Sequence, residues 1–322
     1  MCYSAQILSE YRKFERAFGA GIDIKRYVEL FWEKRKQGGW NKLPKAMRHS
    51  FSPPRNAGEM ELAKLVAEGD RERAEALERE IDEQTARLEK ARAVMASARP
   101  TKKAADDQRI AGNKIRAAQR QLDDLRRKEP MPDDSRIFPG SYAPVMIMQD
   151  NKRVVVPMRY QCRLPGWNAG MERKYPGTYN ARRDKLEESW GKLFGHFHGV
   201  MVANVLYENV ARHAMEQREL AEGERPENVV LEFRPEPPQD MLIACLWSFS
   251  PGMHGEADLF SFAAVTDDPP PEVVAAGHDR FVIPIKPENL DAWLKPNPND
   301  LQALYDILDD RPRPYYEHRI AA

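Results

Sequence analysis

The sequence predicts an α+β protein built on a bent, mixed or antiparallel β-sheet, with flanking helices and an inserted helical hairpin. Three features of the 322-residue chain indicate this class. Amphipathic helical patterns occupy the first part, an aromatic-free charged region follows, and short apolar runs bounded by Pro, Gly and Asp fill the second half. The regular strand–helix alternation of a doubly wound sheet and a glycine-rich phosphate loop are both missing, which disfavours nucleotide binding.

We divide the chain into segments 1–57, 58–130 and 131–322. In the first segment, apolar residues recur at steps of three and four over 7–18 and 22–36. This pattern predicts two helices, separated by Gly19-Ala20-Gly21. The following residues up to 56 are rich in Gly, Pro and Asn and are typical of a connector.

The middle segment predicts a helical hairpin that turns near Arg99-Pro100-Thr101. Ala, Glu, Arg, Lys and Leu dominate it, and apolar residues recur at heptad-like steps. The seam is thin because Gln84 and Ala91 occupy positions that a strong coiled coil gives to Leu. We therefore expect an arm that leans on the body or on a protein partner. Charge runs of this kind are more often solvated faces than DNA contacts.

The last segment is rich in predicted strands. Six short apolar runs are bounded by turn-forming residues. They cover 143–149, 153–158, 199–206, 241–248, 259–266 and 281–285. Helical patterns return at 185–193 and 287–294.

Composition favours a soluble, cytoplasmic protein without membrane contact. The chain is 42% hydrophobic, yet no stretch is long and apolar enough for a signal peptide or a membrane span. Lys+Arg and Asp+Glu each total 50, so net charge leaves nucleic-acid binding open. Cys2, Cys162 and Cys245 suit neither a disulfide framework nor a zinc site, and we expect reduced thiols and no cofactor.

The second residue carries distinctive chemistry. If Met1 is removed, Cys2 becomes a 1,2-aminothiol with a free α-amine beside its thiol. An α-amine has a pKa of about 7.7–8.0 and is partly unprotonated at neutral pH. It can condense with an aldehyde to an imine, which the thiol closes to a thiazolidine.

Five ordered motifs behind Met1-Cys2 give the chain a family resemblance. They are Tyr142-Ala143-Pro144, Met158-Arg159-Tyr160 through Leu164-Pro165-Gly166-Trp167, Tyr179-Asn180-Ala181-Arg182, Leu206-Tyr207-Glu208 and Gly277-His278-Asp279-Arg280. Together they resemble the SOS response-associated peptidase (SRAP) family. The resemblance implies an SRAP-like fold in a bacterial or phage-type protein that joins the nucleoid when it acts in the SOS response to DNA damage. It also implies an autopeptidase that removes Met1 and uses Cys2, with lyase-type chemistry, to crosslink abasic sites in single-stranded DNA.

The resemblance assigns catalytic roles to Cys2, Asn180, Glu208 and His278. Glu208 is similar to the family's acid/base carboxylate, which takes a proton from the amine and returns one to the departing hydroxyl. His278 resembles the histidine that assists opening of the sugar ring. Asn180 would hold the N-terminus or the sugar by uncharged hydrogen bonds.

The same resemblance supplies DNA-binding candidates. Arg182 is similar to a phosphate-gripping arginine, and Trp167 could stack against an exposed base. Arg159 and Arg280 lie in the matched motifs and complete this set. A His196-x-His198 pair could ligate a metal, but no carboxylate or cysteine at metal-ligand spacing lies nearby, and we expect no metal site.

Departures from the family pattern keep two other functions open. Tyr3-Ser4 replaces the usual Gly-Arg, and Tyr160-Gln161-Cys162 replaces Trp-Gly-Leu. One alternative is an N-terminal-nucleophile amidohydrolase, such as a glutamine amidotransferase, in which the Cys2 thiol attacks an amide. The other is a non-catalytic interaction scaffold whose arm binds the partner.

Overall fold

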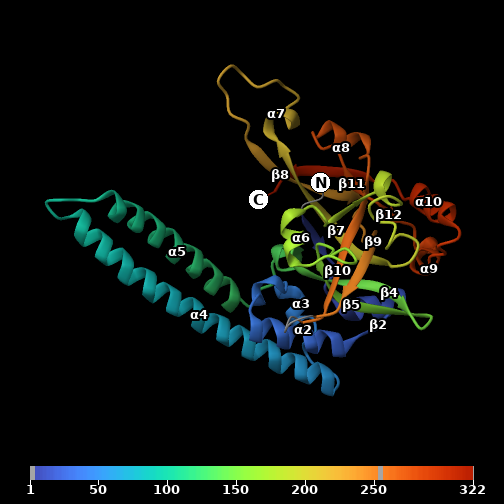
Figure 1. Ribbon diagram of the computed structural model, residues 1–322, viewed down its shortest axis with the longest axis horizontal. Helices are drawn as coiled ribbons and strands as arrows, with labels where there is room; N and C mark the ends of the chain where they lie inside the picture. The colour runs from blue at the N-terminus through green and yellow to red at the C-terminus, as the bar shows by residue number, and fades with distance from the viewer. Residues whose placement is uncertain (1–3, 253–256, 322) are drawn as a thin grey trace.

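A large mixed β-sheet organises the protein (Figure 1). The computed structural model describes residues 4–252 and 257–321. The main path of the sheet runs β12-β9-β10-β5-β4-β7-β1-β3. The described strands are β1 (Ser4–Ile7), β2 (Gly21–Ile22), β3 (Arg136–Ile137), β4 (Tyr142–Gln149), β5 (Lys152–Tyr160), β6 (Asn180–Arg182), β7 (His198–Ala211), β8 (Asn228–Glu236), β9 (Met241–Ser250), β10 (Leu259–Asp267), β11 (Phe281–Val282), β12 (Pro284–Ile285) and β13 (Tyr315–Ile320).

Helices surround the sheet, and two of them form the arm that projects from the body (Figure 1). The described α-helices are α1 (Tyr11–Phe18), α2 (Ile24–Gln37), α3 (Lys45–His49), α4 (Ala57–Met95), α5 (Lys102–Arg126), α6 (Ala169–Lys174), α7 (Arg212–Met215), α8 (Pro271–Ala275), α9 (Leu290–Leu294) and α10 (Leu301–Asp309). In the part of the chain that the structure describes, no helix combines the length and the apolar character needed to cross a membrane.

The predicted fold class is confirmed, and all six predicted strand segments form strands. Two corrections concern helices. The first predicted helix begins at Tyr11 rather than at Ile7, because Ser4–Ile7 pairs as β1 with β7. The predicted helix 185–193 is instead a short 3₁₀ turn followed by further turns. Burial of Trp190 and Phe194 in the core and the left-handed φ of +83° at Gly195 favour turns there.

The first described strand lies between two others. Ser4 pairs with Tyr207 and Ala5 with Leu206 of β7, while Ala5 also faces Ile137 of β3. Ala5 and Ile7 are 2% exposed and belong to the main apolar cluster. This pairing and burial fix the start of the described chain beside the β7 segment that carries Glu208.

The predicted hairpin is confirmed as α4 and α5, but the root of α4 is part of the body. Leu62, Leu65 and Val66 are buried in one cluster with residues of α2 and the following connector. Arg35 of α2 also forms ion pairs with acidic residues of α4, including Glu72 at 2.7 Å. The arm therefore becomes independent of the body only beyond this anchored root.

The distal arm holds itself together. Leu77 of α4 packs against Ala118 and Leu122 of α5 in a small cluster of its own. Arg87 and Asp107 form an ion pair across the two helices nearer the tip. The thin seam predicted from the sequence is thus present, and it joins α4 to α5.

Candidate active site

A buried carboxylate on β7 is the centre of the candidate site. Glu208 is 0% exposed and pairs in register with Leu231 of β8. Because side chains alternate along a strand, Glu208 shares its face of the sheet with Leu206 and Val210, both in the main apolar cluster. Burial of a carboxylate in such surroundings is costly unless another group satisfies it.

His278 supplies that group. Its Nε2 atom lies 3.4 Å from Oε2 of Glu208, and its side chain is 6% exposed. The chain turns sharply after α8, where the His278 amide donates to the Val273 carbonyl at 3.2 Å. Gly277 makes the turn with a φ of +89°, and a Cβ there would meet Ala214 at 3.0 Å. The glycine of this motif is therefore a steric requirement for presenting His278.

The contacts of the imidazole constrain where its proton lies. Nδ1 of His278 lies 2.6 Å from the carbonyl oxygen of Arg280. A carbonyl only accepts, so we assign the Nδ1 proton from this contact, which leaves the lone pair of a neutral ring on Nε2. Favourable contact with Glu208 then requires a proton on either Nε2 or the carboxylate. Burial lowers the pKa of His278 below its ordinary value, which favours the neutral ring.

Asn180 stands at the start of β6, next to β10. In this parallel pairing, Asn180 lies opposite Ala264 and Arg182 lies opposite Thr266. On the other side of β10, Thr266 pairs with Val282 of β11. Asn180 is only 7% exposed, and neither atom of its amide group has a hydrogen-bond partner among the described residues. A buried amide without partners costs free energy, and such groups often mark binding sites.

Arg182 and Arg280 border the His278 turn. Arg182 is exposed and forms two hydrogen bonds with Asp184, at 2.9 and 2.7 Å. The pKa of Arg182 is raised, chiefly by its hydrogen bond with Asp184 and also by the charge of Asp279. The pKa of Asp184 is lowered, chiefly by the same hydrogen bond and also by the charge of Arg280. The Arg280 guanidinium forms no ion pair with any described residue and is partly exposed. These two arginines thus lie in one charged rim near His278.

The other two DNA-binding candidates have partners within the protein. Arg159 on β5 bonds the Gln161 carbonyl at 3.1 Å and forms an ion pair with Glu172 of α6. Glu172 also pairs with Arg163 at 2.9 Å. Trp167 is half-buried, and its ring lies 5.5 Å from that of Tyr175. Arg159 therefore has a structural contact that its place in the motif did not predict.

Cys2 lies outside the described residues, but the residues that follow it reveal contacts that sequence reasoning missed. Ser4 is 0% exposed and accepts a hydrogen bond from Nε of Arg136 at 3.2 Å. The Arg136 guanidinium lies 3.7 Å from the centre of the Tyr207 ring, a cation–π contact. No local signal could reveal this group, because Arg136 is distant in sequence from both partners.

His198 has a structural role. Its Nε2 accepts a hydrogen bond from the Gly195 amide at 2.9 Å, and its ring lies 4.0 Å from that of Trp293. Burial lowers its pKa to about 3, so the ring is neutral near pH 7. Among the described residues, no group of three or more His, Cys, Asp or Glu is placed to hold a metal ion.

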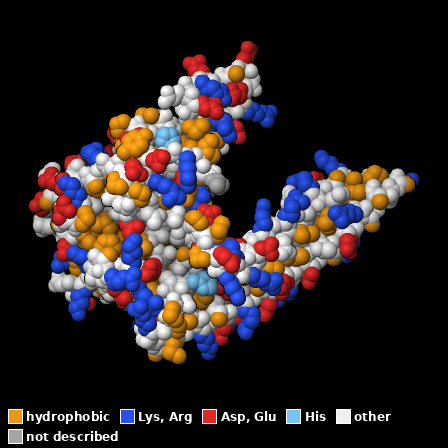
Figure 2. Space-filling model, turned by 180° about the vertical axis from the view of Figure 1, so that it is seen from behind, with side chains coloured by type: hydrophobic (Ala, Val, Ile, Leu, Met, Phe, Trp, Pro, Cys, Tyr) orange, Lys and Arg blue, Asp and Glu red, His pale blue; other side chains and the backbone are white. Residues whose placement is uncertain are grey.

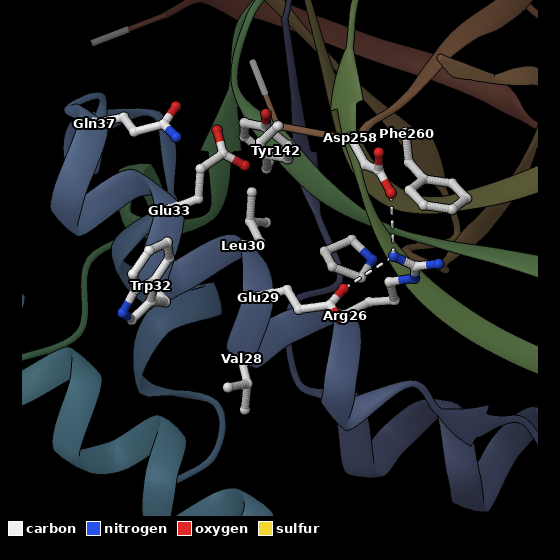
Figure 3. A pocket seen from close by; sticks show the side chains of 12 residues that line it. Arg26, Val28, Glu29, Leu30, Trp32, Glu33, Gln37, Tyr142, Asp258 and Phe260 are labelled. Carbon is white, nitrogen blue, oxygen red and sulfur yellow. Dashed lines mark hydrogen bonds and ion pairs between the residues drawn. The ribbon is translucent and has the colours of Figure 1, made fainter. Parts of the chain in front are cut away.

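A pocket of about 420 Å³ lies on a different part of the body, between α2 and the sheet (Figure 3). Arg26 crosses it, 2.9 Å from Glu29 and 4.0 Å from Asp258. Tyr142 and Trp32 form part of the wall. Its lining includes neither Glu208 nor His278, so we do not assign it to the candidate active site.

The fold and the site define a mixed-sheet protein with a buried carboxylate–imidazole pair beside its N-terminal strand. Residues 99–320 match the family described as SOS response associated peptidase (SRAP). The chain belongs to this family. The matched region contains Asn180, Glu208 and His278 and begins within the arm.

Three solved structures are similar to this chain. A crystal structure of a protein from Bordetella bronchiseptica has a TM-score of 0.47 and 17% identity, covering 58% of this chain and 87% of its own. One from Bacteroides thetaiotaomicron has a TM-score of 0.44 and 12% identity, with coverages of 58% and 78%. A phage-related protein from Bordetella bronchiseptica has a TM-score of 0.43 and 18% identity, with coverages of 61% and 85%. No curated protein matches this chain.

Proposed function

We propose that this protein removes its own Met1 and uses Cys2 to form a covalent crosslink with abasic sites in single-stranded DNA. One observation carries the proposal. The chain enters the sheet at Ser4, paired with Tyr207, and the next residue of β7 is Glu208, whose carboxylate faces Nε2 of His278. Cys2 precedes Ser4 by two residues in the sequence, and on this ground we assign its amine and thiol to the chemistry of the pair.

The chemistry begins with hydrolysis of the Met1–Cys2 peptide bond, which frees the α-amine. The amine adds to the open-chain aldehyde of an abasic deoxyribose, and loss of one water gives an imine. The Cys2 thiol then adds across the C=N bond, forming a C–S bond and returning a proton to nitrogen. The resulting thiazolidine attaches the protein to the lesion.

Each proposed role uses a feature of the described site. Glu208 exchanges protons with the amine and with the departing hydroxyl, and its carboxylate lies 3.4 Å from Nε2 of His278, a second group that can exchange protons. His278 assists opening of the sugar ring, and its neutral form suits that role near pH 7. The amide of Asn180 supplies uncharged hydrogen bonds that no described residue satisfies.

DNA is held beside the site by the exposed arginines of the rim. Arg280 has no ion-pair partner among the described residues and can contact a phosphate directly. Arg182 must exchange its ion pair with Asp184 for a contact with a phosphate. Both side chains are exposed, so breaking this ion pair costs little free energy. Trp167 remains a candidate for stacking on an exposed base. The site of action that we propose is the bacterial cytoplasm, at the nucleoid.

Replacing Cys2 with Ser tests the proposal. The variant keeps the α-amine but replaces the thiol with a hydroxyl, a much weaker nucleophile, so it should form only a reversible imine. We expect the parent protein to give an adduct with an abasic oligonucleotide that survives a denaturing gel, and Cys2→Ser to give little or none. Equal adduct yields would remove the thiazolidine step. Release of ammonia from glutamine without DNA adducts would favour an amidotransferase.

A further inference from the structure

One face of α5 carries a stripe of exposed arginines. Arg109, Arg116 and Arg120 are separated by seven and four residues, which places them on one side of a helix with 3.6 residues per turn. All three are exposed, as is Asn113 between them. The opposite side of α5 is buried against α4. The stripe is therefore the outer face of the arm, about 16 Å long at a rise of about 1.5 Å per residue.

The positive charge of this stripe is largely uncompensated. Residues 108–122 contain no acidic side chain. Arg116 and Arg120 form no ion pair with any described residue, and Arg116 bonds only the neutral side chain of Asn113. Arg109 forms an exposed ion pair with Asp106 at 3.7 Å, and such a pair contributes little to stability. An anionic partner would thus meet three guanidinium groups, of which only Arg109 has to give up an ion pair with a described residue.

The residues around the stripe favour a nucleic-acid backbone over a protein. The region 57–126 contains no Phe, Tyr or Trp, and the stripe is not bordered by exposed large apolar side chains that could anchor a protein interface. Proteins that hold single strands normally provide aromatic side chains for base stacking, which this surface lacks. A row of guanidinium groups without aromatic residues suits the phosphates of a double helix.

We propose that the outer face of α5 binds the sugar–phosphate backbone of double-stranded DNA adjoining the single-stranded lesion. This inference rests on the proposed function and adds a second DNA-binding surface to it. The contacts are with phosphates, so they position the DNA and carry no sequence preference.

The root of the arm lies between the stripe and the N-terminal strand β1. A pocket of about 410 Å³ at the root of the arm is lined by Gln121 of α5, Arg73 of α4 and Arg136 of β3. Arg136 in turn contacts Ser4 and Tyr207. In Figure 1, α5 lies on the side of the arm that faces β8 and α7. Figure 2 shows Lys and Arg side chains along the same edge of the arm.

Two triple variants test the inference in the full chain. The first is Arg109→Gln, Arg116→Gln and Arg120→Gln on α5. The second removes the same charge from exposed residues of α4, as Arg71→Gln, Arg79→Gln and Lys90→Gln. Binding to an undamaged 30-base-pair duplex would be measured by fluorescence anisotropy over a salt series, and crosslinking would be measured with a short abasic oligonucleotide that has no duplex.

The α5 variant should bind the duplex at least about tenfold more weakly than the unsubstituted protein. Its plot of log K against log salt should lose up to about 2.7 in slope, since each phosphate contact contributes about 0.9. The α4 variant should retain affinity and slope, and both variants should crosslink the short oligonucleotide at the unsubstituted rate.

Three results would overturn the inference: no duplex binding by the unsubstituted protein, equal losses in both variants, or loss of a dimer in sedimentation only for the α5 variant. The last result would make the stripe a contact between copies of the chain. Failure of the unsubstituted protein to crosslink the short oligonucleotide would instead contradict the proposed function, because that probe does not need the arm.

Discussion

The buried contact between Glu208 and His278 is the central chemical feature at the scale of residues. The imidazole is held through Nδ1 by the Arg280 carbonyl, which leaves Nε2 to exchange a proton with the carboxylate 3.4 Å away. Both residues are buried, at 0% and 7% exposure, so bulk water has little access to either of them. This coupling explains how one pair could serve as both acid and base.

Separate substitutions distinguish the two roles. His278→Ala should slow crosslinking to a natural abasic site but spare reaction with an aldehyde that is already open. Glu208→Gln should slow both reactions, because it removes proton exchange with the amine and the departing hydroxyl. General acid–base assistance typically contributes about 10²–10⁴-fold, so single-turnover rates should reveal each loss.

Thermal unfolding of the same variants is the control. If His278→Ala lowers both rates equally, ring opening is not its role, even when the variant remains folded. Unchanged rates for Glu208→Gln would remove the acid–base role of that carboxylate.

Helix α4 shows, at the scale of elements, how the arm is joined to the body. Gly69 lies where this helix crosses Trp40, and a Cβ at this position would lie 2.5 Å from the indole ring. The indole nitrogen also donates to Asp70 at 2.7 Å, which holds the ring in place. The close approach of helix and ring therefore requires glycine, although glycine weakens a helix interior.

Matched substitutions of two helical glycines test this account. Gly69→Ala should destabilise the protein by about 1–3 kcal/mol, because the rigid ring and its hydrogen bond must shift. Gly112→Ala in α5 meets only the flexible end of Arg116, at 3.7 Å, and should stabilise the helix by up to about 1 kcal/mol. Chemical denaturation of both variants measures the difference. Equal effects of the two substitutions would show that the Trp40 contact does not anchor the arm.

Sequence patterns predicted the elements with strong periodicity and missed those that depend on distant partners. The apolar runs of β4 and β9 were sufficient to predict these strands, and the heptad-like steps were sufficient to predict the two helices of the arm. Strand β1 has only four residues, too few to show an alternation, and β13 is polar and exists through pairing with β8. The turns at 185–193 form because tertiary burial outweighs the local helical pattern.

The candidate site could be predicted only in part for the same reason. The motifs that resemble the SRAP family identified Glu208 and His278, and the structure brings them together. The contacts of Arg136 with Ser4 and Tyr207 join segments far apart in the sequence, so no local pattern could indicate them. Arg159 appeared in a motif as a DNA-binding candidate, yet its ion pair with Glu172 was not foreseeable.

At the scale of the whole molecule, the described body presents the site beside an arm that extends well beyond the sheet (Figure 1). The carboxylate–imidazole pair belongs to the body, whereas the arginine stripe belongs to the arm, and the family match covers both. The two parts meet at the pocket that Arg136 and Gln121 line. In the two proposals made above, the body carries the chemistry and the arm holds the duplex next to the lesion.

Intact mass spectrometry of the purified protein, before and after incubation with single-stranded DNA carrying one abasic site, tests the central claim most directly. The account predicts a starting mass that lacks Met1. It then predicts a product equal to the protein plus the oligonucleotide minus one water, because imine formation expels water and thiol addition expels nothing. A protein that retains Met1 and gains no mass on incubation would contradict the account.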